Sequence, residues 1–135
     1  MENNIEYIGK VKIDYSYYSG RDMYVDGSEE ELLNIVKNHS HSEYNHIIEE
    51  KNSWPILYHL SDIRGNIVDW LPISKNDKVL EIGSGCGAIT GTLARKAGRV
   101  DCIELSRARS LVNAERNREY DNINIIVGNF QEVEQ

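Results

Sequence analysis

The sequence predicts an α/β protein in which the first half of a doubly wound parallel sheet follows a mainly helical N-terminal segment. Two observations support this prediction. From residue 78 onward, short apolar runs alternate with helix-like stretches, whereas the earlier residues are more polar and carry helix start and stop signals. We therefore expect the helical segment over residues 1–75 and the partial sheet domain, with three strands, over residues 76–135.

The first helices are indicated by capping signals. Residues 5–27 hold five tyrosines among polar residues and glycines, which indicates irregular structure with at most one short strand. Ser28 and Glu31 form a capping-box pattern before an apolar stretch, so a helix is expected to begin there. A second short helix is expected over residues 43–51.

A third helix is expected between residues 53 and 72. Ser53 can cap it and Pro55 suits its first turn. Apolar residues then recur at helical spacing until Pro72, namely Leu60, Ile63, Ile67 and Leu71. Gly65 lies inside this pattern and weakens it.

The second half of the chain alternates strands with helices. Ser106 is a cap for the second of these helices, and Gly98 follows the first as a helix-ending residue. Because parallel strands need such crossovers, this order predicts a parallel sheet. The expected elements are strands over 78–82, 99–105 and 123–127, and helices over 88–97 and 106–120.

Charge and cysteine content limit the functional classes. The formal net charge is −7, and residues 1–77 hold 14 acidic and 7 basic residues against 8 of each in the remainder. This balance argues against a broad nucleic-acid-binding face. Cys86 and Cys102 have no neighbouring residues of the kinds that bind metals. The sequence shows no signal peptide and no apolar span near 18 residues. We therefore expect a reduced, cytoplasmic setting and no membrane partner.

A glycine-rich loop between the first strand and its helix indicates nucleotide binding. Gly83, Gly85 and Ala88 satisfy a dinucleotide-binding pattern, and Glu104 lies about 21 residues after Gly83, where a ribose-binding acid is expected. Two details favour another ligand over NAD. Glu81 lies two residues before the first glycine, and a third glycine, Gly87, follows two residues after the second.

Three segments together resemble the class I S-adenosylmethionine-dependent methyltransferases, which are Rossmann-like. They are Val79 to Gly87, Val100 to Leu105 and Ile125 to Phe130, and each lies at the C-terminal end of a predicted strand. The resemblance covers roughly residues 76–130 and implies S-adenosyl-L-methionine as the cofactor.

The resemblance also implies a role for each matching residue. The loop Gly83-Ser84-Gly85-Cys86-Gly87 would pass the methionine part of the cofactor, and Glu81 would contact its ammonium end. Glu104 would accept both ribose hydroxyls, since one carboxylate has enough lone pairs for two donors. Three residues would contact the adenine: Leu105 its face, Asn129 its amino group in place of the usual Asp, and the N–H of Phe130 a ring nitrogen.

Simpler interpretations remain for other conspicuous residues. The two cysteines are expected to be packed small residues, because nothing nearby would lower a thiol pKa. The three histidines at positions 39, 41 and 46 do not have a standard zinc-ligand spacing, so we expect no metal site. The four arginines between residues 107 and 118 are most simply the wet face of a helix.

The resemblance does not supply a catalytic residue. Methyltransferases of this class have a seven-stranded sheet, so the catalytic and acceptor-binding parts are expected beyond Gln135. We expect a fragment, an associating chain or a poorly folding one, because its sheet would have an unpaired edge. A small-molecule or sugar acceptor is favoured. An adenine dimethylase of ribosomal RNA and a non-catalytic docking module are the alternatives.

Overall fold

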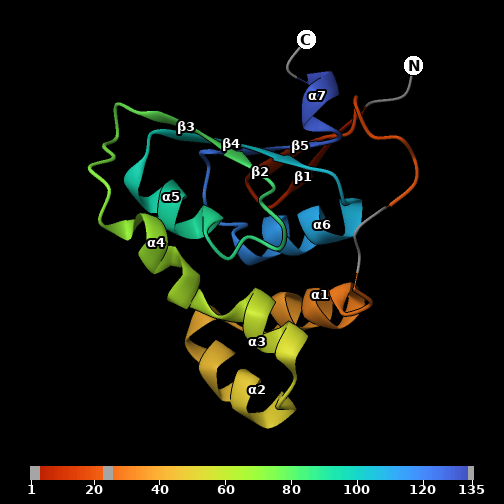
Figure 1. Ribbon diagram of the computed structural model, residues 1–135, viewed down its shortest axis with the longest axis vertical. Coiled ribbons are helices and arrows are strands. Elements are labelled where there is room, and N and C mark those ends of the chain that lie inside the picture. The colour runs from red at the N-terminus through yellow and green to blue at the C-terminus, as the bar shows by residue number, and fades with distance from the viewer. Residues whose placement is uncertain (1–3, 23–25, 134–135) are drawn as a thin grey trace.

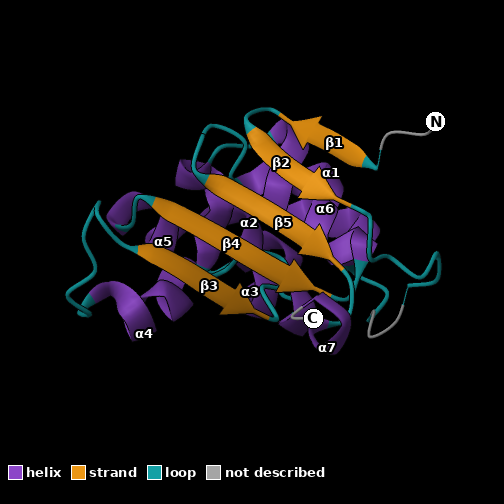
Figure 2. Cartoon of the chain, turned by 90° about the horizontal axis from the view of Figure 1, so that it is seen from above, coloured by secondary structure: helices purple, strands orange, loops and turns teal. Residues whose placement is uncertain are grey.

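The computed structural model of the protein describes residues 4–22 and 26–133. Its strands form one five-stranded sheet within these residues, with the order β1-β2-β5-β4-β3 (Figure 2). The strands are β1 (Ile5–Ile8), β2 (Val11–Asp14), β3 (Lys78–Ile82), β4 (Arg99–Glu104) and β5 (Ile123–Val127). The helices are α1 (Glu29–Asn38), α2 (Tyr44–Lys51), α3 (Trp54–Leu60), α4 (Asn66–Asp69), α5 (Thr90–Lys96), α6 (Arg107–Arg116) and α7 (Phe130–Val133), with the 3₁₀-helices η1 (His41–Glu43) and η2 (Asp62–Gly65).

The three strands predicted from residue 78 onward form a parallel ladder. β3 pairs with β4, and β4 pairs with β5, so that Glu81 lies opposite Cys102 and Glu104 lies opposite Val127. β3 and β5 have the predicted bounds, and β4 ends one residue earlier than predicted. α5 and α6 make the two crossovers. The predicted α/β class with a mostly parallel sheet is therefore confirmed.

Two further strands extend this sheet, where the sequence predicts irregular structure with one short strand. β1 and β2 form an antiparallel hairpin around Gly9, whose φ is +57°, and β2 pairs in parallel with β5. Val11 and Ile13 are fully buried, whereas Lys12 between them is only partly buried. In β2 the alternation of buried and partly buried side chains includes only two residues on each face, and the strand pairs with β5 more than a hundred positions away. The local sequence pattern alone therefore does not reveal this strand.

Helices cover one face of the sheet in two layers. Figure 1 shows α5 and α6 next to the strands and α1, α2 and α3 beyond them, while α7 stands on the other side. One apolar cluster joins the sheet to α5 and α6, and a second joins α6 to the outer helices. Val112 is fully buried in this second cluster together with Leu32 and Ile56. The boundary between residues 75 and 76 stays a prediction, but the first strands share the sheet of the second half.

β3 is the outermost strand on the side opposite to the hairpin. The exposed fractions of Leu80 and Ile82 are 54% and 53%, because no element of the described chain covers these side chains. An unpaired edge with exposed apolar side chains is what the sequence analysis expects of the sheet.

The predicted third helix is broken into three pieces. Ser61 takes an extended conformation, with φ −63° and ψ 136°, and its hydroxyl accepts a hydrogen bond from the N–H of Ile63 to begin η2. Ile63 and Ile67 are 70% and 62% exposed, so the helical spacing of apolar residues does not mark a buried stripe. Gly65 is required at the break, since an added Cβ would lie 2.3 Å from the Thr92 hydroxyl oxygen.

The predicted cap at the start of α1 is also different. Ser28 makes no capping hydrogen bond to the helix, and its N–H and hydroxyl instead donate to Asp26. Glu29, not Glu31, accepts the N–H groups of the preceding residues 26 and 27. A capping box does occur at η1, where Ser40 and Glu43 pair reciprocally.

The arginines of α6 do not form a single wet face. The Arg116 side chain is 2% exposed, and its guanidinium donates to the carbonyl oxygens of His59 and Leu60 at 2.7 and 2.8 Å. It also pairs with Asp62 at 3.0 Å. Arg116 thereby satisfies the carbonyl groups at the end of α3, which would otherwise be buried without partners. α6 ends at this residue, four positions before the predicted end.

Candidate functional site

A groove lies where the carboxyl ends of β3, β4 and β5 meet. Its volume is about 400 Å³, which is within the range of small-molecule pockets. Ligands of open parallel sheets bind at this end of the strands. The lining residues are Ile82, Gly83, Ile103, Glu104, Leu105, Arg109, Gly128, Asn129 and Phe130. Five of the ten residues that the sequence analysis singles out for the cofactor lie in this groove, from three separate chain segments.

The glycines of the loop have two different reasons to be glycine. Gly83, Gly85 and Gly87 all have positive φ angles, of +75°, +57° and +86°. An added Cβ at Gly83 or Gly85 would meet no atom within 4 Å, so these two residues leave open space for a ligand. At Gly87 the same atom would lie 2.4 Å from the Asn113 side-chain oxygen. Gly87 therefore lets the loop pack on α6, whatever the loop binds.

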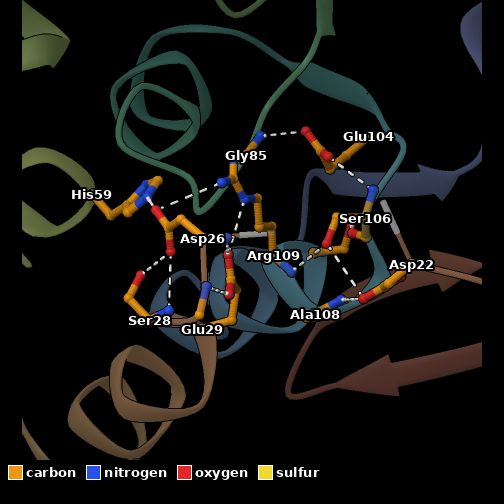
Figure 3. A network of polar contacts seen from close by, with 12 residues as sticks. Asp22, Asp26, Ser28, Glu29, His59, Gly85, Glu104, Ser106, Ala108 and Arg109 are labelled. Carbon is orange, nitrogen blue, oxygen red and sulfur yellow. Dashed lines mark hydrogen bonds and ion pairs between the residues drawn. The ribbon is translucent and has the colours of Figure 1, made fainter. Parts of the chain in front are cut away.

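Glu104 is the polar centre of the groove. It is 8% exposed, and its two carboxylate oxygens accept hydrogen bonds from the backbone N–H groups of Gly85 and Ser106, both at 2.8 Å (Figure 3). These bonds hold the carboxylate in one orientation between the loop and the start of α6. Each oxygen keeps a further lone pair for a donor on a ligand.

The N-terminus of α6 is held by two capping side chains. The Ser106 hydroxyl accepts from the N–H of Arg109 at 3.1 Å, as the sequence predicts. Asp22, from the N-terminal segment, accepts from the N–H groups of Arg107 and Ala108 at 2.7 and 2.9 Å (Figure 3). Burial alone would raise the pKa of Asp22, but these helix N–H donors outweigh it and hold the pKa below its ordinary value. Asp22 thus ties the N-terminal segment to the helix that follows Glu104.

Glu81 lies beneath the loop and is not part of the groove lining. Its carboxylate accepts from the Thr90 hydroxyl at 2.6 Å, and the Cys102 sulfur lies 3.7 Å from the same oxygen. Burial raises the pKa of Glu81, and the hydrogen bond from Thr90 opposes part of that rise. Its contact with a cofactor stays a prediction.

The side chains of Ser84 and Cys86 point into the protein. The Ser84 hydroxyl is buried and makes no hydrogen bond with any described residue. Cys86 packs in the apolar cluster with Val112, and burial raises the pKa of its thiol to about 12. Burial also raises the pKa of the Cys102 thiol. The expectation that both cysteines are packed is confirmed, and only the backbone of Ser84 and Cys86 is available to a ligand.

The far end of the groove is built by the residues after β5. Gly128 is required by close packing, since an added Cβ would lie 2.7 Å from the Cβ of Tyr17. Asn129 directly precedes α7, and its side-chain oxygen accepts from the N–H of Gln131 at 2.9 Å. Leu105 and Phe130 add apolar surface to the groove. Tyr24, another member of the tyrosine group, lies outside the described residues.

Arg109 is a groove residue that the sequence analysis misses. Its Nε donates to Glu29 at 3.2 Å, and its Nη2 lies 3.7 Å from Asp26 (Figure 3). Asp26 in turn accepts from Nε2 of the buried His59 at 2.8 Å. Through these contacts, Arg109 joins the groove to the start of α1 and to the end of α3. The one feature of the sequence that could have indicated Arg109 is its position in the first turn of the helix that closely follows Glu104.

The histidines singled out in the sequence do not converge on one point. The His39 ring lies 2.9 Å from Glu43, whereas that of His41 lies 3.1 Å from the Arg116 carbonyl oxygen. His46 is exposed. Over residues 4–22 and 26–133, no group of three His, Cys, Asp or Glu side chains is arranged to hold a metal ion. No helix in the same ranges is long and apolar enough to cross a membrane.

The arrangement is suited to holding a ligand with a diol and a planar apolar group. It offers a fixed carboxylate, an open glycine loop and apolar walls at the ends of three adjacent strands. Positioning of a cofactor is the chemistry that such a groove can supply.

Known proteins with similar sequences are methyltransferases. The family model described as protein-L-isoaspartate(D-aspartate) O-methyltransferase matches residues 31–131. A probable ribosomal RNA small subunit methyltransferase A of Pyrococcus furiosus is 33% identical over 93 residues, which cover 69% of this chain and 33% of that protein. Protein-L-isoaspartate O-methyltransferase 2 of Archaeoglobus fulgidus is 41% identical over 66 residues, which cover 43% of this chain and 29% of that protein. The chain spans about a third of the length of these curated relatives.

A solved structure shares the fold. Phosphoethanolamine N-methyltransferase 1 of Haemonchus contortus, in complex with phosphoethanolamine and S-adenosylhomocysteine, is 23% identical with a TM-score of 0.50. The likeness covers 79% of this chain and 24% of that one. Because the family model matches well over half of its residues, the chain belongs to the protein-L-isoaspartate(D-aspartate) O-methyltransferase family, and its resemblance to the class I S-adenosylmethionine-dependent methyltransferases is confirmed.

Proposed function

We propose that the chain binds S-adenosyl-L-methionine in the groove and is the cofactor-binding part of a methyltransferase. The observation that carries this proposal is Glu104, a buried carboxylate fixed by two backbone N–H groups beside a glycine loop that leaves open space. The family membership of the chain supports the same activity.

Each part of the groove suits one part of this cofactor. The free lone pairs of Glu104 would accept the two ribose hydroxyls. Leu105 and Phe130 would enclose the adenine. Asn129 would accept the adenine amino group with the second lone pair of its side-chain oxygen, since the first already accepts from Gln131. This contact would be weaker than with Asp, because the amide carries no charge.

The bound cofactor supplies a methyl group activated on a sulfonium. The residues described above bind and orient it, and orientation supplies much of the catalysis in an in-line displacement. Gly83 would let the cofactor pass close to the backbone at the end of β3. Glu104 is the one carboxylate among the described residues that line the groove, and it is assigned here to the ribose, so we assign no general base.

The acceptor that we favour is a small molecule or a sugar. The formal net charge of −7, with 14 acidic and 7 basic residues over positions 1–77, would repel a polyanion from most of the surface. An RNA acceptor is one alternative, since one relative is named as a ribosomal RNA methyltransferase. A labelled RNA oligonucleotide at low salt distinguishes them: we expect no saturable binding, and tight binding would favour RNA.

Calorimetric titration of the 135-residue chain with S-adenosylhomocysteine tests the proposal. We expect one site, and a loss of affinity of about 100-fold in Glu104→Ala, because two hydrogen bonds to a charged group are worth about 3 kcal/mol together. The control is Glu30→Ala on α1, which removes an exposed carboxylate and should bind like the wild type. Circular dichroism verifies that each variant is folded. A folded wild-type chain that binds neither S-adenosylhomocysteine nor S-adenosylmethionine would contradict the proposal and favour a docking module.

A further inference from the structure

A buried row of polar side chains runs from α6 to Glu81. The Asn117 amide nitrogen donates to the Asn113 side-chain oxygen at 2.8 Å, and the Asn113 amide nitrogen donates to the Thr90 hydroxyl oxygen at 3.1 Å. The Thr90 hydroxyl donates in turn to Glu81 at 2.6 Å. Every donor in this row points toward the carboxylate.

The row is costly to bury. Asn113 and Thr90 are 0% exposed and Asn117 is 1% exposed. The side-chain oxygen of Asn117 has no hydrogen-bond partner among the described residues. Buried polar groups in such positions usually serve a purpose, because apolar residues of the same shape would pack there at lower cost.

The glycine loop is shaped around the same row. An added Cβ at Gly87 would lie 2.4 Å from the Asn113 side-chain oxygen, and one at Gly91 would lie 2.8 Å from that of Asn117. The backbone of the loop and of α5 thus rests directly on these two amides. Asn113 contacts both the loop and the donor of Glu81, which couples their positions.

The surroundings of Glu81 make the hydrogen bond from Thr90 important. Four groups act on its carboxylate: Thr90 from α5, Cys102 and the Glu104 charge from β4, and the Arg64 charge from η2. Burial favours the protonated form, and the Thr90 hydrogen bond favours the charged form. The hydrogen bonds from Thr90 and Cys102 both reach the same oxygen of Glu81, so within the described residues the other oxygen is left for a further donor.

We propose that Thr90 and Asn113 are positioning residues, which hold the Glu81 carboxylate in one orientation so that its second oxygen receives the ammonium group of the cofactor's methionyl end. This inference rests on the proposed function. Glu81, outside the groove, would bind the amino-acid end of the ligand. The hydrogen bonds that support it run from α6 through α5 to β3.

The variant Thr90→Val tests the inference, since valine has the shape of threonine and lacks the donor. We expect its affinity for S-adenosylhomocysteine to fall about tenfold at pH 7, as for the loss of one hydrogen bond to a charged group. Without that bond the pKa of Glu81 rises further. Binding should therefore decline at a higher pH than in the wild type when the titration is repeated from pH 8 down to pH 5.

Three comparisons separate positioning from a general effect on the fold. Thr90→Ser restores the hydroxyl and should restore the affinity and the pH profile. Thr92→Val removes another buried hydroxyl of α5, which accepts a hydrogen bond from Arg95 and does not contact Glu81. This variant should bind S-adenosylhomocysteine like the wild type. The ligand 5′-methylthioadenosine lacks the amino-acid end, so its affinity should be equal in the wild type and in Thr90→Val. Thr90→Ala provides a second removal of the donor if the valine variant does not fold.

The inference is overturned if Thr90→Val and Thr90→Ser bind S-adenosylhomocysteine with the same affinity and pH profile. It is also overturned if Thr90→Val loses affinity for 5′-methylthioadenosine to the same extent. A folded wild-type chain that does not bind S-adenosylhomocysteine would overturn the proposed function itself. The two failures are therefore distinguishable.

Discussion

Replacing Gly83 and Gly87 by alanine, one at a time, separates ligand binding from folding at the glycine loop. Both residues have positive φ angles, of +75° and +86°. An L-residue in this region costs about 1–2 kcal/mol. At Gly83 the new methyl group meets no atom within 4 Å, so this strain is the whole expected loss in the free energy of unfolding.

Gly87→Ala carries an additional cost. Its methyl group would lie 2.4 and 2.7 Å from the side-chain oxygen and carbon of the fully buried Asn113. Overpacking of this kind adds about 1–3 kcal/mol. The total loss is therefore about 2–5 kcal/mol, and urea unfolding followed by circular dichroism measures it.

The effects on binding should have the opposite order. The Gly83→Ala methyl group points into the open side of the loop, so we expect calorimetry to show at least about a tenfold loss of affinity for S-adenosylhomocysteine, or about 1.4 kcal/mol. A Gly83→Ala variant that binds like the wild type would refute the placement of the ligand. A Gly87→Ala variant no less stable than Gly83→Ala would refute the packing of the loop on α6.

Two more predictions concern contacts between the two halves of the chain. Arg116→Met should lower the free energy of unfolding by about 2–4 kcal/mol, because it leaves two buried carbonyl groups unsatisfied. Arg99→Met, at a side chain that is 53% exposed, should cost less than about 1 kcal/mol in the same urea titration, and equal losses would count against the buried role of Arg116. Asp22→Asn should be about 1 kcal/mol less stable than the wild type at pH 7. The pKa of Asp22 is lowered in the folded state. The difference in stability between the variant and the wild type should therefore be present above the unfolded pKa of about 4 and disappear as the pH falls through the folded pKa. A difference in stability that grows in acid would contradict the capping role.

The parts of the fold that follow from the sequence are those specified locally. β3 and β5 are short apolar runs bounded by turn residues, and Ser106 caps α6 as its position predicts. The hairpin of β1 and β2 depends on pairing with β5, far away in the chain, and no local pattern contains that information. The break at Ser61 and the close packing of Gly65 against Thr92 are tertiary features, which helical periodicity cannot anticipate.

The candidate site divides in the same way. The spacing of Gly83, Glu104 and Asn129 at three strand ends is sufficient to bring them into one groove. The sequence cannot show that Ser84 and Cys86 turn their side chains inward, because this depends on the course of the loop over α6. Arg109 enters the groove through ion pairs with residues that precede it by about 80 positions.

Two-dimensional NMR of the ¹⁵N-labelled chain during titration with S-adenosylhomocysteine tests the central claim most directly. The account predicts saturable shifts of the backbone amides that surround the groove, at Gly83, Gly85, Leu105 and Phe130, with the amides of α2 unchanged. A folded chain whose spectrum does not change, or whose shifts gather on α2 and α3 instead, would contradict the claim that this groove holds the cofactor.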